Sequence, residues 1–282
     1  SLAVAPAFFG LFGFIFLVPQ YFQVARGYDP LSAGLHPLPF VVAAGVVAPI
    51  SARLALRFGT KRVVGTGLLS MSVGFLVAST NDATSSYWLE VVPAMVFMAG
   101  GLGLTTAPAT EAIMGSLPVD KAGVGSAVND TTREIGGTLG VAVVGSVFSS
   151  LYGPDVVASL TRLGAPPEAA AIARESVVAA AEVARRAPEA VRPAILEAAS
   201  DAFLHGMALG CRVAGLATLV GSAVAFAALG MAFAVFGAVA TFAGAVVAFV
   251  ALPARATEPA DATGTRPDPD PRGELVEAGP AV

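Results

Sequence analysis

The sequence predicts an all-α integral membrane protein built as a six-helix bundle, and three observations lead to this fold class. Hydrophobic residues make up 55% of the 282 residues, charged residues only 13%, and the mean hydropathy is +0.75. A soluble domain of this length does not have such a composition. Apolar stretches also recur along the chain at lengths close to the roughly 20 residues that a helix needs to cross a bilayer. Because lipid offers the backbone no hydrogen-bond partners, we expect these stretches to be helices.

Five transmembrane helices are expected within residues 1–152. Their apolar cores are Leu2–Phe22, Leu35–Ala52, Val63–Ala78, Val91–Ala109 and Gly136–Leu151. The chain opens at Ser1 and enters the first stretch at once, without the charged segment and small-residue cleavage site of a signal peptide. We therefore expect this sequence to be part of a longer protein.

The orientation of these helices follows from a basic loop between the second and third spans. Arg53, Arg57, Lys61 and Arg62 lie there around Gly59, with no acidic residue among them. Short loops rich in Arg and Lys stay in the cytoplasm, so this loop is predicted to be cytoplasmic.

Residues 153–205 are then predicted to be an extracytoplasmic loop, since spans alternate in direction. The segment carries mixed charges and a helix-forming composition interrupted at Pro188 and Pro193. We expect one or two short helices there.

A terminal membrane segment is expected over residues 206–252, followed by a disordered tail over residues 253–282. As one helix, the roughly 45 residues of the apolar stretch would extend about 68 Å, more than a bilayer accommodates. The stretch is therefore either two spans with a turn near Gly230, which adds one span to the bundle, or one span and an interfacial piece. The tail is rich in Pro, Ala, Asp and Gly and has an acidic balance.

Several function classes are excluded by composition and spacing. The net charge of −4 offers no basic surface for nucleic acid. His36 and His205 are far apart, and the chain has one cysteine, so we expect no metal site and no catalytic residues. The sequence has neither a nucleophile-elbow motif nor a phosphate-binding loop. An enzyme and an ATP-driven pump are both excluded on these grounds.

Polar residues inside apolar spans are the candidate site residues, because such residues normally face a bundle interior or a water-filled path. Near the end of the first span and the end of the fourth, they predict a substrate cavity formed by Gln20, Tyr21, Gln23, Thr105, Thr106 and Glu111.

A charged cluster opens the fifth span and is predicted to couple protons or cations. Asp130, Arg133 and Glu134 share one helix face at spacings i, i+3 and i+4. Arg133 is expected to neutralise Asp130, which leaves Glu134 free to bind and release a proton. The alternative is that the three charges form a solvated cap at the membrane interface.

Three stretches together resemble a known family of transporters. Arg53–Arg62 resembles the basic loop between the second and third helices of each half of major facilitator superfamily proteins. Residues 108–143 resemble the penultimate-helix region, and residues 16–35 the ninth helix and its outer turn, of fourteen-span drug/proton antiporters of the EmrB/QacA type. Leu56 stands where that family often has Asp.

The resemblance implies a C-terminal half-bundle of a secondary transporter in the inner membrane. It implies export of amphipathic or cationic drug-like molecules in exchange for protons, with no cofactor besides the proton-motive force. The implied partners are the lipid bilayer, protons, a small-molecule substrate and the missing N-terminal half. An importer or uniporter of another solute, or a membrane bundle that does not transport, remain the alternatives.

Overall fold

The structure is a computed structural model that describes residues 3–251, and side-chain surroundings are described for residues 3–228. The chain divides into two units, Ser1–Val235 and Phe236–Val282. The contacts below lie within the first unit. The tail predicted over residues 253–282 lies outside the described residues.

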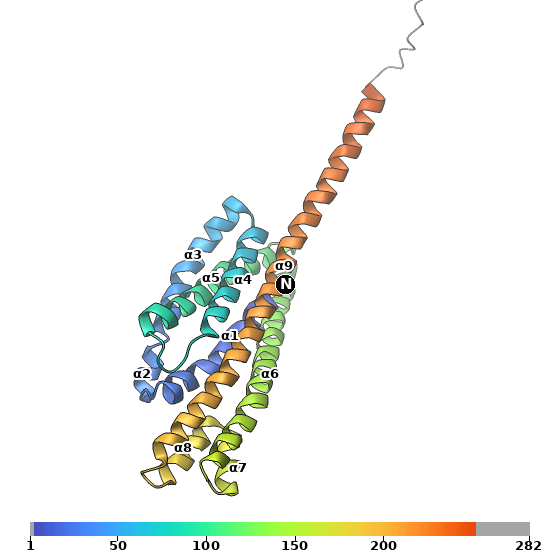
Figure 1. The fold of residues 1–282 in the computed structure, drawn as a ribbon. Helices are drawn as coiled ribbons and strands as arrows, with labels where there is room; N and C mark the ends of the chain where they lie inside the picture. The colour runs from blue at the N-terminus through green and yellow to red at the C-terminus, as the bar shows by residue number, and fades with distance from the viewer. Residues whose placement is uncertain (1–2, 252–282) are drawn as a thin grey trace, which may run out of the picture. The chain divides into compact units, whose positions relative to one another are not determined.

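Every regular element in the described part of the chain is helical (Figure 1). In chain order these elements are α1 (Val4–Gln20), the π-helical turn η1 (Tyr21–Ala25), α2 (Pro30–Leu35), α3 (Leu38–Phe58), α4 (Thr60–Ala78), the π-helical turn η2 (Tyr87–Val91), α5 (Val92–Met114), the short turn η3 (Val119–Lys121), α6 (Ala122–Arg162), α7 (Pro167–Glu175), α8 (Val177–Arg186) and α9 (Arg192–Ala251).

Six of these helical segments are long and apolar enough to cross a membrane, which confirms the predicted fold class. They are Val4–Ala25, Pro30–Phe58, Thr60–Ala78, Tyr87–Met114, Val119–Arg162 and Arg192–Ala228. Short loops join the first five. Helices α3, α4 and α5 lie beside one another, and α1 packs against α6.

Glycines set how closely these helices approach. A Cβ added to Gly101 of α5 would lie 2.3 Å from the carbonyl oxygen of Gly67 in α4, and one added to Gly140 of α6 would lie 2.3 Å from the carbonyl oxygen of Phe9 in α1. Such distances are far below van der Waals contact. Small residues let transmembrane helices pack backbone to backbone, and van der Waals packing of this kind drives helix association in lipid.

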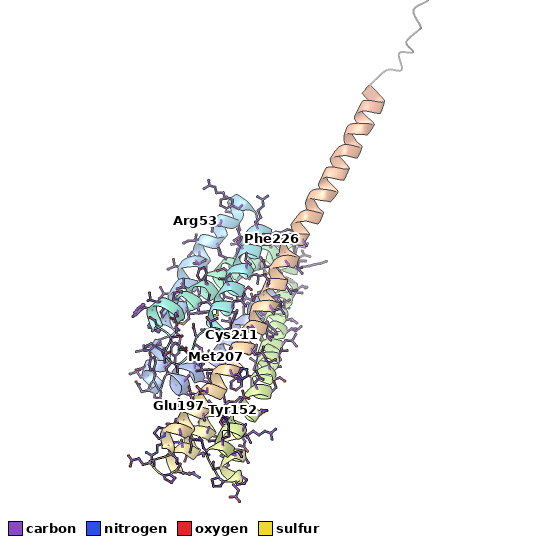
Figure 2. All side chains as sticks on the ribbon, viewed as in Figure 1. Arg53, Tyr152, Glu197, Met207, Cys211 and Phe226 are labelled. Carbon is purple, nitrogen blue, oxygen red and sulfur yellow. The ribbon has the colours of Figure 1, made fainter. Side chains whose placement is uncertain are left out.

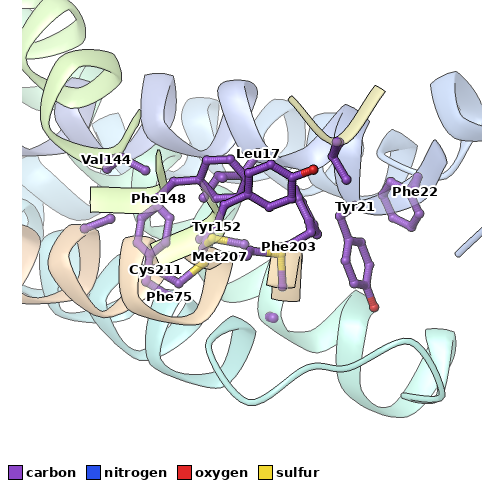
Figure 3. Close-up of a cluster of buried hydrophobic side chains, with 14 of the residues drawn as sticks. Leu17, Tyr21, Phe22, Phe75, Val144, Phe148, Tyr152, Phe203, Met207 and Cys211 are labelled. Atoms are coloured by element: carbon purple, nitrogen blue, oxygen red, sulfur yellow. The ribbon is translucent and has the colours of Figure 1, made fainter. Parts of the chain in front are cut away.

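Helix α9 packs against α4 and α6. The Ser72 hydroxyl of α4 donates to the Gly215 carbonyl at 2.8 Å, and the Ser222 hydroxyl donates to the Gly65 carbonyl at 2.9 Å. Below them, Phe203 packs edge to face on Phe148 of α6 (Figure 3). Both hydroxyls would otherwise be unsatisfied in an apolar setting, so each bond fixes the position of α9.

The segment predicted over residues 153–205 is more helical than expected. Two short helices, α7 and α8, are present, but α6 continues to Arg162 and α9 already begins at Arg192. Pro154 lies inside α6 without ending it. Pro193 lies in the first turn of α9, where its missing N–H costs no helical bond, and Pro188 lies in the turn before it. The backbone of α9 continues as one helix through Gly230, where a turn was one of the two alternatives.

Candidate functional site

The six residues predicted to form a substrate cavity do not gather around one space. Gln20, Thr105 and Thr106 each donate to a carbonyl of their own helix, four residues back. Gln23 and Glu111 are exposed. Tyr21 lines a small cavity, and its hydroxyl donates to the Asp82 carbonyl at 3.1 Å.

Arg133 lies at the junction of α1, α5 and α6. Its Nη2 donates to the Thr110 hydroxyl at 3.0 Å, and its guanidinium carbon lies 5.0 Å from the centre of the Phe8 ring. No ion pair links it to a carboxylate of the described residues, so the expected neutralisation of Asp130 does not occur there. The guanidinium is instead held by a hydroxyl and an aromatic face, a combination that leaves its charge uncompensated.

Two buried polar atoms near this junction have no hydrogen-bond partner among the described residues. They are Nε of Arg133 and Oδ1 of Asn129, one helical turn earlier on the same face of α6. Asn129 is only 5% exposed. A buried donor or acceptor left unsatisfied costs about 1–3 kcal/mol, so these two atoms lower the stability of this junction.

Asp130 and Glu134 lie on the exposed side of α6. The Ser126 hydroxyl approaches Asp130 Oδ2 at 3.5 Å, a weak contact at best. Both carboxylates therefore lie on the outer surface of the described bundle, and neither forms an ion pair with Arg133.

The predicted basic loop is a single residue between two helix ends. Gly59 joins α3 to α4 with φ of +88°, a conformation that favours glycine. Arg53 and Arg57 lie in the last turns of α3, while Lys61 and Arg62 lie in the first turn of α4, and all four are exposed. Figure 2 shows Arg53 at one end of the bundle, far from Tyr152 near the other. We call the end with Arg53 the basic-loop end.

Aromatic rings close the opposite end, which we call the aromatic end. His36 lies between Tyr28 and Tyr87, with ring centres 4.3 and 4.8 Å away, and the Tyr87 hydroxyl donates to the His36 carbonyl at 2.8 Å. Arg26, which follows η1, donates to the Ala83 carbonyl at 3.2 Å and links the end of η1 to the loop before η2. In that loop, hydrogen bonds from Thr84 hold the pKa of Asp82 below its usual range.

The two ends differ in the space they enclose. Under the aromatic end, Tyr21, Phe22, Met95 and Cys211 are among the residues around a cavity of about 40 Å³, room for one or two waters. At the basic-loop end, a cavity of about 570 Å³ lies among α1, α4, α5, α6 and α9. A further cavity of about 620 Å³ lies among α7, α8 and the start of α9.

Comparison with known proteins identifies the family. Residues 1–161, more than half of the chain, match the Major Facilitator Superfamily. This chain belongs to the Major Facilitator Superfamily. Its membership in a transporter family agrees with the prediction that it is not an enzyme, and its six apolar helices agree with a multi-pass protein of the plasma membrane.

Curated relatives of this chain include several resistance proteins. It is 33% identical over 228 residues to the multidrug efflux pump LfrA of Mycolicibacterium smegmatis, covering 79% of this chain and 43% of LfrA. It is 33% identical over 224 residues to a tetracenomycin C resistance and export protein of Streptomyces glaucescens, covering 77% of this chain and 41% of that protein. It is 31% identical over 203 residues to the methyl viologen resistance protein SmvA of Salmonella typhimurium, covering 71% and 40%. The chain thus spans less than half the length of these relatives.

The sequence did not predict the large cavity at the basic-loop end. Lys61, which lines it, was interpreted as a signal of orientation and as part of the family-like basic loop, and Phe8 was one apolar residue among many. A usable signal was present in the spacing of Gly125, Asn129, Arg133 and Gly136, which places two polar side chains on the glycine-bearing face of α6 that packs on α1.

Proposed function

We propose that this chain is the C-terminal six-helix half of a fourteen-span transporter that exports amphipathic drug-like molecules in exchange for protons. Two observations carry this proposal. The described part of the chain has six candidate spans, and the chain matches less than half the length of relatives named for multidrug efflux, tetracenomycin C export and methyl viologen resistance. In this superfamily the substrate site lies between two halves, so one half presents an incomplete site.

The exposed apolar faces of two helices support this half-transporter proposal. On α3, the side chains of Val41, Val42, Val46 and Ile50 are 46–62% exposed. Only 11% of the most apolar stretch of α3 is buried, compared with 50% for α4. On α6, Val124, Ile135 and Leu139 are exposed beside Asp130 and Glu134. We propose that the N-terminal half covers the charged face of α6, since carboxylates facing hydrocarbon are costly.

Transport then requires the two ends of the bundle to open in turn. With the aromatic end closed and the large cavity at the basic-loop end, this half has the form expected when substrate enters from the side of the basic loop. One proton that moves down 100 mV provides about 2.3 kcal/mol, enough for a roughly fiftyfold substrate gradient. Glu134 and Asp130, on the face turned to the other half, are the proposed proton carriers.

An efflux assay tests this proposal. Cells that lack their own efflux pumps are loaded with a panel of amphipathic dyes, and the complete protein that contains this chain is compared with the chain alone. The complete protein should export at least one dye, export should stop when a protonophore collapses the proton gradient, and the chain alone should export none. Export that survives the protonophore would contradict proton coupling, and export by the chain alone would contradict the half-transporter.

A further inference from the structure

Four cations lie together on the outside of the basic-loop end, and we call them the basic surface. They are Arg53, Arg57, Lys61 and Arg62, placed around Gly59, and Arg53 marks their position in Figure 2. All four are exposed, and no ion pair links them to a carboxylate of the described residues. Because like charges so close together repel one another, an anion that lies over this surface is attracted by all four.

The other charged residues near the basic surface do not cancel its charge. In η3, Asp120 and Lys121 carry opposite charges that offset each other. Glu111, in the last turn of α5, adds one negative charge against the four positive ones. Asp130 and Glu134 lie two turns or more into α6, away from its start at this end. The basic-loop end therefore keeps a net positive charge in the described part of the chain.

Apolar side chains are exposed among these cations. Leu56 lies between Arg53 and Arg57 at the end of α3 and is 89% exposed. Phe58 is 48% exposed, and the centre of its ring lies 5.3 Å from the guanidinium carbon of Arg57. Water does not favour apolar side chains so exposed, since they gain stability on leaving it. A bilayer interface favours both kinds of residue, because apolar side chains insert between headgroups while cations meet phosphates.

An apolar stripe on α4 continues from the basic surface along the helix. Leu69, Val73 and Leu76 form this α4 stripe, and they are 39–47% exposed. Arg62 precedes Leu69 by seven residues, which places it on the same helix face, about 10 Å away along the axis. The polar headgroup layer lies directly outside the hydrocarbon core. A lipid whose acyl chains lie on the α4 stripe therefore places its phosphate beside Arg62.

We propose that the basic surface binds the headgroup phosphate of an anionic phospholipid, with the acyl chains of that lipid on the α4 stripe. Guanidinium groups form paired hydrogen bonds with phosphate oxygens, and three of the four cations are arginines. The surface selects phosphatidylglycerol over phosphatidylcholine, because the choline cation of the latter offsets its own phosphate and is repelled here. This interaction does not depend on which solute the complete protein transports.

Site-specific cross-linking tests the assignment. The complete protein that contains this chain is placed in phosphatidylcholine nanodiscs with a few per cent of a phosphatidylglycerol analogue that carries a photoreactive acyl chain. The yield of cross-links to the α4 stripe is measured by peptide mass spectrometry. Each cation near a membrane surface contributes about a fivefold factor to affinity, so Arg57→Gln combined with Arg62→Gln should lower the yield about twenty-five-fold. The double change to Lys keeps the charge and should retain most of it. Arg185→Gln combined with Arg186→Gln removes two exposed charges from α8 and should have no effect.

A matched pair at Leu56 separates charge from shape. Leu56→Asp places a carboxylate between Arg53 and Arg57 and should lower the cross-linking yield about fivefold, the effect of one cation neutralised. Leu56→Asn has nearly the same shape without the charge and should lower the yield less than twofold. Because Leu56 is exposed, neither variant should change the amount of folded protein.

Four results would overturn the lipid assignment. One is a yield in the doubly Gln-substituted basic surface equal to that of the unsubstituted protein, and another is an equal loss in the α8 control. A third is the absence of cross-links to the α4 stripe in the unsubstituted protein, which would mean that another part of the complete protein covers it. The fourth is displacement of the analogue by soluble glycerol phosphate, which would assign the surface to a soluble phosphate ester.

Discussion

The aromatic end and the basic-loop end of the bundle are formed largely by the same long helices, yet they differ in whether their polar side chains find hydrogen-bond partners. At the aromatic end, Tyr21, Tyr87 and Arg26 each bond to a backbone carbonyl of another segment, and the cavity beneath them measures about 40 Å³. Toward the basic-loop end, Arg133 and Asn129 each keep one buried atom without a hydrogen-bond partner among the described residues, and a separate cavity of about 570 Å³ lies at that end. The aromatic end is therefore closed by bonds between segments of this chain, whereas the basic-loop end keeps a large space between its helices.

Both ends depend on the close contact between α4 and α5 at Gly67 and Gly101, and loss of this contact should have the strongest effect of the changes considered. Gly101→Val should abolish the folded protein, since the added side chain would overlap the Gly67 carbonyl and Met71 of α4, and overpacking even at milder sites costs about 1–3 kcal/mol. Gly100→Val is the matched control, because a Cβ added at this neighbouring position would meet nothing closer than 4.0 Å. Fluorescence-detected size-exclusion chromatography of the two variants measures the folded fraction. A folded Gly101→Val protein would show that the close approach of α4 and α5 is not required.

Much of the fold could be predicted from the sequence, because the length of an apolar stretch is a local property. The first five predicted stretches each fall largely within the expected helix, and the ends of α3 and α4 lie on either side of Gly59. The start of α9 before the apolar stretch could also have been predicted from the sequence. Ile195, Ala199, Ala202 and Phe203 repeat at helical spacing and are all buried, although charges between them obscure the apolar pattern.

The site could not be predicted in the same way, since its contacts join residues that are distant in sequence. Helix spacing favoured a local pair between Arg133 and Asp130, but the guanidinium bonds to Thr110, 23 residues away, and stacks on Phe8. The end of the apolar stretch at Leu151 likewise suggested that α6 ends there. The helix continues because Tyr152, Val156 and Leu160 are buried on its far side, and the Tyr152 hydroxyl donates to the Ala173 carbonyl of α7 at 2.9 Å.

The second prediction assigns the two ends of the bundle to the two sides of the membrane. In a Cys211→Ala background, Thr60→Cys at the basic-loop end should resist a membrane-impermeant maleimide in intact cells, because positive loops stay in the cytoplasm. Ala83→Cys, in the exposed loop of the aromatic end, should be labelled readily. Both positions should react after permeabilisation. The reverse pattern in intact cells would invert the topology.

The third prediction concerns the exposed face of α6 that carries Asp130 and Glu134. Glu134→Gln in the complete protein should lower proton-dependent export at least tenfold and flatten its pH profile, since a neutral amide cannot carry a proton. The amount of folded protein should not change, because the Glu134 side chain is exposed. Asp130→Asn, one turn earlier and equally exposed, is the matched comparison and should show a smaller effect. Export and pH dependence equal to those of the unsubstituted protein would favour the interfacial cap.

The mildest substitution tests whether the aromatic end is held shut by the bonds seen there. Tyr87→Phe removes the hydroxyl that donates to the His36 carbonyl and leaves the ring in place, a loss of about 0.5–1.5 kcal/mol, or roughly a twofold to twelvefold rise in the open population. Cys211 reports on this opening, because its buried thiol lines the small cavity beneath Tyr21 and Phe22. The rate at which an impermeant maleimide modifies Cys211 should rise by the same factor when opening is faster than labelling. Trp88→Phe, at the neighbouring ring that is 71% exposed, should leave the rate unchanged. An unaltered rate in Tyr87→Phe would mean that stacking of the rings, and not this hydrogen bond, keeps the aromatic end closed.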